Sequence, residues 1–212
     1  MSQNRSHAVM AQRIEPPDSL DDFPTPPWGG RALVEQFIRP LGLLWPGARL
    51  WEPACNRGYL IRGLATYFGS ALYATDVFDY GWPRMDAQAD FLFPGVLPPE
   101  PVDWIITNPP FRLAEEFAAK AMTIARIGAA MLVRTAFLEG IGRFERLFSV
   151  TPPTIVAQFV ERLPMVKGRC DPEASTATSY AWLVWIRGME RRPFDWVVPC
   201  RKRLERPGDY DG

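Results

Sequence analysis

Four consecutive residues, Asn108, Pro109, Pro110 and Phe111, carry the groups needed to hold an amino group beside a planar ring. They follow an apolar run, residues 103–107, that is typical of a buried parallel strand. Because proline has no N–H to donate, the chain must leave the sheet there, at the edge where open α/β sheets bind ligands. The Asn108 side-chain carbonyl and the Pro109 backbone carbonyl are two acceptors for an NH2 group, and Phe111 offers a stacking face. A rigid turn between a strand and a helix is the simpler interpretation.

A second candidate site follows the first predicted core strand, residues 48–51. Its residues are Glu52, Pro53, Ala54, Cys55 and Gly58. Small residues let a backbone approach a ligand closely, and the N–H groups of the predicted helix that follows could bind a carboxylate. The three-glycine dinucleotide fingerprint is absent, because only Gly58 and Gly63 are present, and this argues against NAD.

An acidic residue, Asp76, ends the second predicted strand, residues 71–76. A carboxylate at that position can accept both hydroxyls of a ribose, and its distance from Glu52 is close to the roughly 20 residues typical of nucleotide-binding folds. A helix cap or a strand terminator is the alternative role. Asp79 is a less favoured substitute.

Strands and helices must alternate to bring these segments to one edge, which predicts an α/β doubly wound fold with a mostly parallel sheet. Besides the strands already given, the predicted strands cover residues 129–133, 154–159 and 180–186. The predicted helices cover residues 29–39, 59–67, 113–127 and 138–148.

The order of motifs from residue 23 to residue 135 resembles the gamma-type arrangement of S-adenosylmethionine-dependent DNA amino-methyltransferases. The resemblance implies the class I (Rossmann-like) methyltransferase fold, with a seven-stranded sheet, and S-adenosylmethionine as cofactor. It makes residues 108–111 the catalytic loop and the Glu52–Gly58 segment and Asp76 the cofactor site. By the same resemblance, further cofactor contacts come from Thr25 in a Thr-Pro pair, from Asp90 and Phe91, and from Phe117, for which core packing is the alternative role.

The activity implied by the resemblance is methyl transfer to the exocyclic N6 of adenine in duplex DNA, with the base flipped out of the helix. Cytosine N4 is an open alternative. So are an RNA base, at adenine N6 or guanine N2, and a protein glutamine, although tyrosine is then typical after the prolines. A non-catalytic DNA-binding module of the same fold is a further alternative. Nothing resembles the nucleophilic cysteine motif of C5 methyltransferases.

We expect the chain to divide into a flexible arm at 1–22, a domain at 23–189 for which the resemblance implies methyltransferase activity, and a basic tail at 190–212. A loop at about 161–179 is expected to recognise DNA through Arg162, Lys167 and Arg169. Residues 1–106 contain 8 Lys/Arg and 12 Asp/Glu, and residues 107–212 contain 16 and 12, which favours a phosphate-binding face in the second half. Related enzymes usually carry a separate recognition domain, so the chain resembles a compact phage or prophage type.

The cysteines and the hydropathy pattern limit the other classes of function. Cys55, Cys170 and Cys200 lack metal-ligand spacing, and the single histidine is His7, so no metal site is predicted. No apolar run approaches the ~20 residues of a membrane span, and the N-terminus lacks a signal-peptide core. A cytoplasmic protein with reduced thiols is expected, of undetermined oligomeric state.

Overall fold

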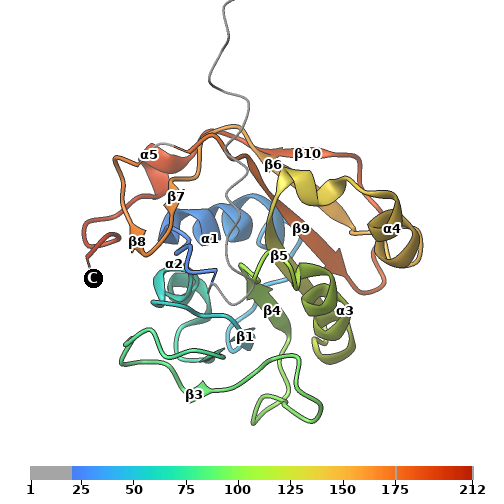
Figure 1. Cartoon of the computed structure of the whole chain (residues 1–212), viewed down its shortest axis with the longest axis horizontal. Helices are drawn as coiled ribbons and strands as arrows, with labels where there is room; N and C mark the ends of the chain where they lie inside the picture. The colour runs from blue at the N-terminus through green and yellow to red at the C-terminus, as the bar shows by residue number, and fades with distance from the viewer. Residues whose placement is uncertain (1–20, 175, 212) are drawn as a thin grey trace, which may run out of the picture.

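The computed structural model describes residues 21–174 and 176–211, in which eight strands form one sheet in the order β10-β6-β9-β5-β4-β1-β2-β3 (Figure 1). The strands of this sheet are β1 (Leu50–Glu52), β2 (Leu72–Asp76), β3 (Ala87–Gln88), β4 (Trp104–Thr107), β5 (Gly128–Arg134), β6 (Ile155–Phe159), β9 (Tyr180–Ile186) and β10 (Asp195–Val197). A separate two-stranded hairpin consists of β7 (Met165–Val166) and β8 (Arg169–Cys170). The pairing is parallel except at β9, which runs antiparallel to β5 and β6.

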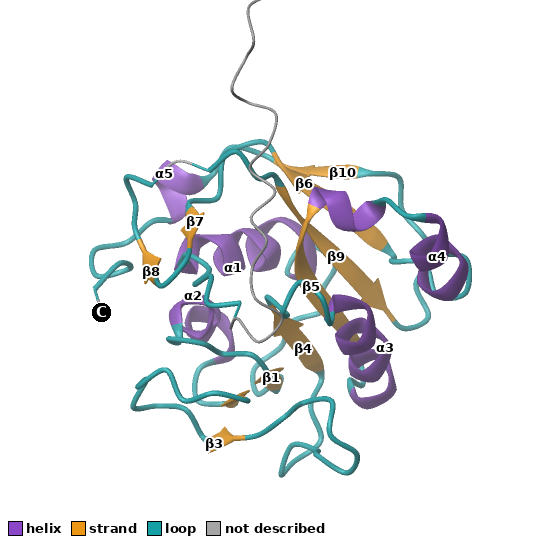
Figure 2. Cartoon of the chain, in the orientation of Figure 1, coloured by secondary structure: helices purple, strands orange, loops and turns teal. Residues whose placement is uncertain are grey.

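Helices cover both faces of the sheet, α1 and α2 on one and α3 with η3 on the other (Figures 1 and 2). The helical segments are α1 (Pro27–Leu33) continued by η1 (Val34–Ile38), α2 (Tyr59–Phe68), α3 (Ala114–Ile124), η2 (Thr135–Leu138), α4 (Ile141–Arg143), η3 (Phe144–Phe148) and α5 (Arg201–Leu204). The helix expected at 138–148 begins at Ile141 and continues through α4 and η3 to Phe148, because Gly140, with a φ of +113°, separates it from η2.

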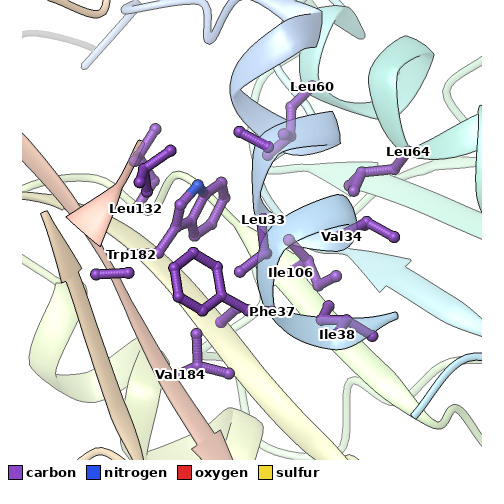
Figure 3. Close-up of a cluster of buried hydrophobic side chains, with 14 of the residues drawn as sticks. Leu33, Val34, Phe37, Ile38, Leu60, Leu64, Ile106, Leu132, Trp182 and Val184 are labelled. Atoms are coloured by element: carbon purple, nitrogen blue, oxygen red, sulfur yellow. The ribbon is translucent and has the colours of Figure 1, made fainter. Parts of the chain in front are cut away.

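Alternate residues of β4 supply the two halves of the core. Ile106 packs with Leu33 and Leu64 on the α1 and α2 side, together with Trp182 of β9 (Figure 3). Ile105 belongs to the cluster formed with α3 on the opposite face. Both faces of the strand are therefore buried, which explains its uninterrupted apolar sequence and fixes the position of the loop that follows.

The eighth strand corrects the expected strand number of seven and the expected basic tail. Val197 is buried and Trp196 exposed, the alternation of an edge strand, and β10 pairs with β6. Further along, Asp209 and Arg31 of α1 form a buried ion pair with two 2.7 Å hydrogen bonds. Residues 190–211 thus belong to the folded domain; arginines on both sides of this short apolar strand made it resemble a solvated tail.

Three other expectations concern the ends and the surface of the chain. Most of the expected arm, residues 1–20 with His7, lies outside the described residues. The segment expected as a loop at 161–179 contains the β7–β8 hairpin, anchored by the buried side chains of Leu163 and Met165. No helix in the described part of the chain is long and apolar enough to span a bilayer.

Candidate active site

A cavity of about 360 Å³ is lined by the segments that follow β1, β2 and β4. The candidate residues that line it are Thr25, Pro53, Ala54, Cys55, Asp76, Asp90, Phe91, Asn108, Pro110 and Phe117. Glu52, Gly58, Pro109 and Phe111 lie in the same two loops but outside the lining. The fold therefore brings the sequence motifs to one edge of the sheet, as parallel strands require.

Asp76 holds the loop between β1 and α2 in place. One carboxylate oxygen accepts from the Asn56 N–H at 2.8 Å, and the other accepts from the Phe78 N–H at 3.0 Å. Burial raises the pKa of Asp76, and these backbone N–H groups oppose the rise. A carboxylate has about four acceptor positions, so both oxygens can still accept from hydroxyl groups in the cavity. The loop-fixing and ribose-binding roles are thus compatible.

Position 58 must be a glycine because the Trp82 ring packs against it. The φ of Gly58 is +74°, and a Cβ atom there would lie 2.1 Å from the Trp82 ring. Asn56, two residues earlier, also has a positive φ of +50°. The glycine therefore permits a tight turn under an aromatic ring.

Glu52 lies beneath the cavity and is completely buried. Its Oε1 accepts from the Ala54 N–H at 3.3 Å, whereas its Oε2 has no hydrogen-bond partner among the described residues. Burial raises its pKa well above the ordinary 4.5, and the effects of Thr107 and of the Ala54 N–H only partly oppose this. Glu52 therefore holds the start of the loop through the Ala54 N–H, and burial favours its protonated form.

Aromatic rings form the apolar wall of the cavity. The rings of Phe91 and Phe117 lie 4.7 Å apart, and Trp51 contacts Phe91 edge-on at 5.0 Å. Phe91 and Phe117 are both buried, so each also packs in the core. Beside them, the exposed carboxylate of Asp90 accepts from the Leu92 N–H. An apolar wall with a carboxylate at its margin suits a flat, amino-bearing heterocycle.

The thiol of Cys55 lines the cavity but is not activated. Burial raises its pKa above its ordinary value, and the carboxylates of Glu52 and Asp76 raise it further. A neutral thiol is a poor nucleophile. Among the described residues, no group of three or more His, Cys, Asp or Glu side chains could hold a metal ion.

The side-chain amide of Asn108 is oriented by the segment before α1. Its Nδ2 donates to the Phe23 carbonyl at 2.9 Å, and its buried Oδ1 has no partner within the described chain. The next loop contact comes from Asp21, whose carboxylate accepts from the Phe111 N–H at 2.8 Å. These two bonds fasten the 108–111 loop at both ends and leave one amide oxygen free to accept.

The ring of Phe111 is already in contact with a cation. The guanidinium carbon of Arg134, the last residue of β5, lies 3.7 Å from the Phe111 ring centroid. The Phe23 ring lies 5.3 Å from Phe111 and 5.4 Å from the Arg134 guanidinium. If Phe23 and Arg134 lay on opposite faces of Phe111, they would be much farther apart, so Phe23 lies beside the ring.

Two described residues of the cavity lining have buried polar atoms without a hydrogen-bond partner. Among the described residues, buried side-chain oxygens without a hydrogen bond include Thr25 Oγ1, Glu52 Oε2, Thr107 Oγ1 and Asn108 Oδ1. Leaving a buried polar group unsatisfied costs about 1–3 kcal/mol, so such atoms indicate a missing partner. Thr25 and Asn108 also line the cavity, and their oxygens fit a ligand that carries donor groups.

The three candidate nucleic-acid contacts lie on the segment after β6. Arg162 donates to the Ala177 carbonyl and the Ser179 hydroxyl, and Arg169 pairs with Asp171 at 3.1 Å. Lys167 is exposed in the β7–β8 turn. The neighbouring Gly168 N–H donates to the Asp22 carbonyl at 2.8 Å, which ties this hairpin to the segment bordering the cavity.

Several cavity residues were missed by the sequence interpretation. They are Asp21, Phe23, Pro24, Tyr59, Leu60, Val77, Tyr80, Arg112 and Leu113. Asp22 is a further omission, because its carboxylate accepts from Asn56 and Arg57 at 2.9 and 2.7 Å. Proximity to the Thr25-Pro26 pair was a usable signal for Phe23. The sequence around Arg134 did not indicate its contact with Phe111, because that contact depends on how far β5 extends past the end of β4.

No protein-family model matches the sequence, and no curated protein matches it either. Solved structures do resemble the fold. A type I restriction-modification methyltransferase subunit from Streptococcus thermophilus has a TM-score of 0.60 at 12% identity, over 91% of this chain and 50% of that one. A proposed RNA methyltransferase from Pyrococcus horikoshii has a TM-score of 0.55 at 18% identity, over 82% and 90%. DNA-bound LlaBIII, an ATP-dependent type ISP restriction-modification enzyme, has a TM-score of 0.50 at 9% identity, over 85% and 20%.

The chain spans about half the length of the Streptococcus thermophilus subunit and a fifth of LlaBIII. At these identities the likeness shows the fold alone. The expected fold class is confirmed: the chain has the mostly parallel α/β architecture of class I methyltransferase structures.

Proposed function

We propose that this chain is an S-adenosylmethionine-dependent methyltransferase that modifies the exocyclic amino group of a nucleic-acid base, with adenine N6 in DNA as the preferred acceptor. The observation that carries the proposal is the buried, unpartnered Oδ1 of Asn108 at the cavity, with the amide nitrogen occupied by the Phe23 carbonyl. An amide held in this way has its oxygen oriented as a free acceptor. An amino group is the complementary donor.

The residues around the cavity fit the proposed cofactor. S-adenosylmethionine supplies an electrophilic methyl group on a sulfonium when it is bound. Asp76 would accept from its ribose hydroxyls, and the Phe91–Phe117 wall with Asp90 would hold its adenine. The unpartnered hydroxyl of Thr25 would accept or donate at the amino-acid end. All of these groups border one cavity of about 360 Å³, within the range of small-molecule sites.

The 108–111 loop would position the acceptor nitrogen. Asn108 Oδ1 and the Pro109 carbonyl would accept its two hydrogens and direct its lone pair toward the cavity. They would also stabilise the positive charge that develops on nitrogen as it is alkylated. The released proton can pass to water, because an aromatic ammonium-like nitrogen is strongly acidic. The raised pKa of Cys55 makes a covalent cysteine mechanism unsuitable here.

A nucleic acid is favoured over a protein substrate by two features. Phe111 is a stacking surface beside the acceptor group, and a base can be flipped onto such a surface. Lys167 and Arg169 lie on the hairpin tied to Asp22, and Arg162 lies just before it; there they would contact phosphates near the flipped base. The structural neighbours named for DNA restriction systems and for RNA methylation agree with either nucleic acid.

The test is transfer of a labelled methyl group from S-adenosylmethionine to duplex DNA, RNA and protein in parallel. The labelled product is then digested and identified as a nucleoside. We expect N6-methyladenine from DNA, and a rate of labelling that is lower by on the order of 10²-fold with Asn108→Ala. Label in protein glutamine, or none in any acceptor despite cofactor binding, would exclude the proposal.

A further inference from the structure

The Arg134 guanidinium covers a face of the Phe111 ring on which the proposed chemistry requires a base to stack. Arg134 ends β5, three residues beyond Met131, which pairs with Thr107 at the end of β4. This extension carries the guanidinium over the 108–111 loop. The 3.7 Å separation from the Phe111 centroid equals carbon–carbon van der Waals contact, so a base cannot share that face with it.

The backbone of Arg134 is held more firmly than its side chain. Its Cα pairs with Tyr180 in the antiparallel β5–β9 ladder. Its guanidinium interacts with the Tyr180 hydroxyl, whereas its Nε has no hydrogen-bond partner and no carboxylate among the described residues forms an ion pair with it. The ring contacts with Phe111 and Phe23 add to this interaction, and a bidentate ion pair with a phosphate would be stronger than either ring contact.

The charges around the cavity favour a second position for the Arg134 guanidinium. The carboxylates of Asp21, Asp76 and Asp90 line the cavity, and Arg112 is the cation in that lining. A polyanion approaching the 108–111 loop would therefore meet mostly negative charge. A guanidinium released from Phe111 would provide a bidentate donor for a phosphate at this entrance.

We propose that Arg134 covers the stacking face of Phe111 in the free protein and moves to a nucleic-acid phosphate when a base takes its place on the ring. This inference rests on the proposed function. Arg134 is thus a positioning residue that keeps the ring covered between turnovers and then holds the backbone beside the extruded nucleotide. In this exchange a base replaces the guanidinium on the Phe111 ring, and the displaced guanidinium forms an ion pair with a phosphate.

Three substitutions separate this role from simple packing. Arg134→Lys keeps the charge, Arg134→Ala removes both the charge and the cover, and Arg134→Met removes the charge but keeps an apolar side chain over the ring. Binding of a fluorescein-labelled duplex of mixed sequence is measured by anisotropy at several salt concentrations. The slope of log affinity against log salt should fall by about one for Arg134→Ala and Arg134→Met and stay unchanged for Arg134→Lys. Arg39→Ala, an exposed arginine beyond η1, should leave the slope unchanged.

Methyl transfer to DNA should decline in the order Arg134→Lys, Arg134→Ala, Arg134→Met, and the decline should appear as a higher KM for DNA. The methionine variant should be the least active because its side chain blocks the Phe111 ring and contacts no phosphate. A packing role predicts the reverse order for Ala and Met. Wild-type protein that methylates nucleic acid, with unchanged slopes in the variants or with Met more active than Ala, would overturn this inference alone. Wild-type protein that binds cofactor but methylates no nucleic acid would end both this inference and the proposed function.

Discussion

Asn108 Nδ2 donates to the Phe23 carbonyl across 2.9 Å, and this bond leaves Asn108 Oδ1 as the free acceptor of the 108–111 loop. An asparagine side chain that rotates freely offers either a donor or an acceptor to a ligand. Here the segment before α1 uses the donor, so an amino group meets an acceptor that is already oriented. Such preorganisation is the main way in which polar groups accelerate reactions.

Asn108→Ala should slow the chemical step while leaving cofactor affinity unchanged, because the lost acceptor acts on the methylated nitrogen. The expected loss is on the order of 10²-fold. Single-turnover kinetics at saturating cofactor measure it. Phe23→Leu is the matched control, since it keeps the backbone carbonyl that orients the amide. An Asn108→Ala protein that reacts at the wild-type rate would reduce the loop to a turn.

Phe111→Ala should weaken capture of the acceptor base by ~1–3 kcal/mol, the usual contribution of one stacked base. Phe111→Trp and Phe111→Tyr should keep much of the activity, since both retain a flat ring. The KM for the nucleic acid and the single-turnover rate distinguish weaker capture from slower chemistry. Equal activity of the alanine and tryptophan variants would show that no base stacks there.

Asp76→Ala should weaken S-adenosylmethionine binding by ~1–3 kcal/mol, because it removes acceptors for ribose hydroxyls. It also frees the backbone N–H groups of Asn56 and Phe78. Asp76→Asn keeps one carbonyl oxygen and should lose less affinity. Calorimetry measures binding, and thermal unfolding of the cofactor-free variants separates it from loss of stability. Unchanged affinity in Asp76→Ala would remove Asp76 from the cofactor site.

The motifs of the site could be predicted from sequence because each depends on a few adjacent residues. The prolines after β4 force the loop at Asn108, and Asp76 ends a strand whose apolar pattern is clear. Parallel pairing then brings these strand ends together without further information. This is why the ten candidate residues border a single cavity.

Contacts between distant segments could not be predicted in this way. The Phe23–Asn108 bond spans 85 residues, and the position of Arg134 depends on the register of β5. The short strand β10 lacked the length that makes periodicity visible, and its arginine-rich flanks resembled solvated chain. Tertiary pairing with β6 decided its structure, rather than local sequence.

Glu52 should make stability depend on pH. Burial raises its pKa well above 4.5, so between that value and the raised one the native state keeps a proton that the unfolded chain has lost. The free energy of unfolding therefore falls as pH rises through this window and levels off above it. Glu52→Gln removes the titration and keeps an acceptor for the Ala54 N–H. For Glu52→Gln, urea unfolding across the acidic and neutral range should give an unfolding free energy that varies less with pH than that of the wild type and is greater at neutral pH. Parallel profiles for the two proteins would mean that Glu52 does not titrate in this way.

The C-terminal segment should be required for stability through Asp209. Its carboxylate pairs with Arg31 by two 2.7 Å bonds, and both side chains are only 4% exposed. Asp209→Ala leaves the Arg31 guanidinium buried without its counter-charge, which typically costs 3–5 kcal/mol (an order-of-magnitude figure). Urea unfolding measures this loss. The double variant Arg31→Met/Asp209→Leu should recover much of it, because an apolar pair needs no desolvation of charge.

The exposed pair of Arg39 and Glu35 provides the control for this last prediction. The Arg39 side chain is 65% exposed, so Arg39→Ala should change the free energy of unfolding by less than ~1 kcal/mol. A similarly small effect of Asp209→Ala would mean that residues 190–211 do not pack on α1 in solution. The expected large loss, with recovery in the double variant, would show that truncation after Met189 removes part of the folded domain rather than a tail. Nucleic-acid affinity lost on such truncation therefore cannot be assigned to phosphate contacts, and single substitutions such as Arg169→Ala are the appropriate probes.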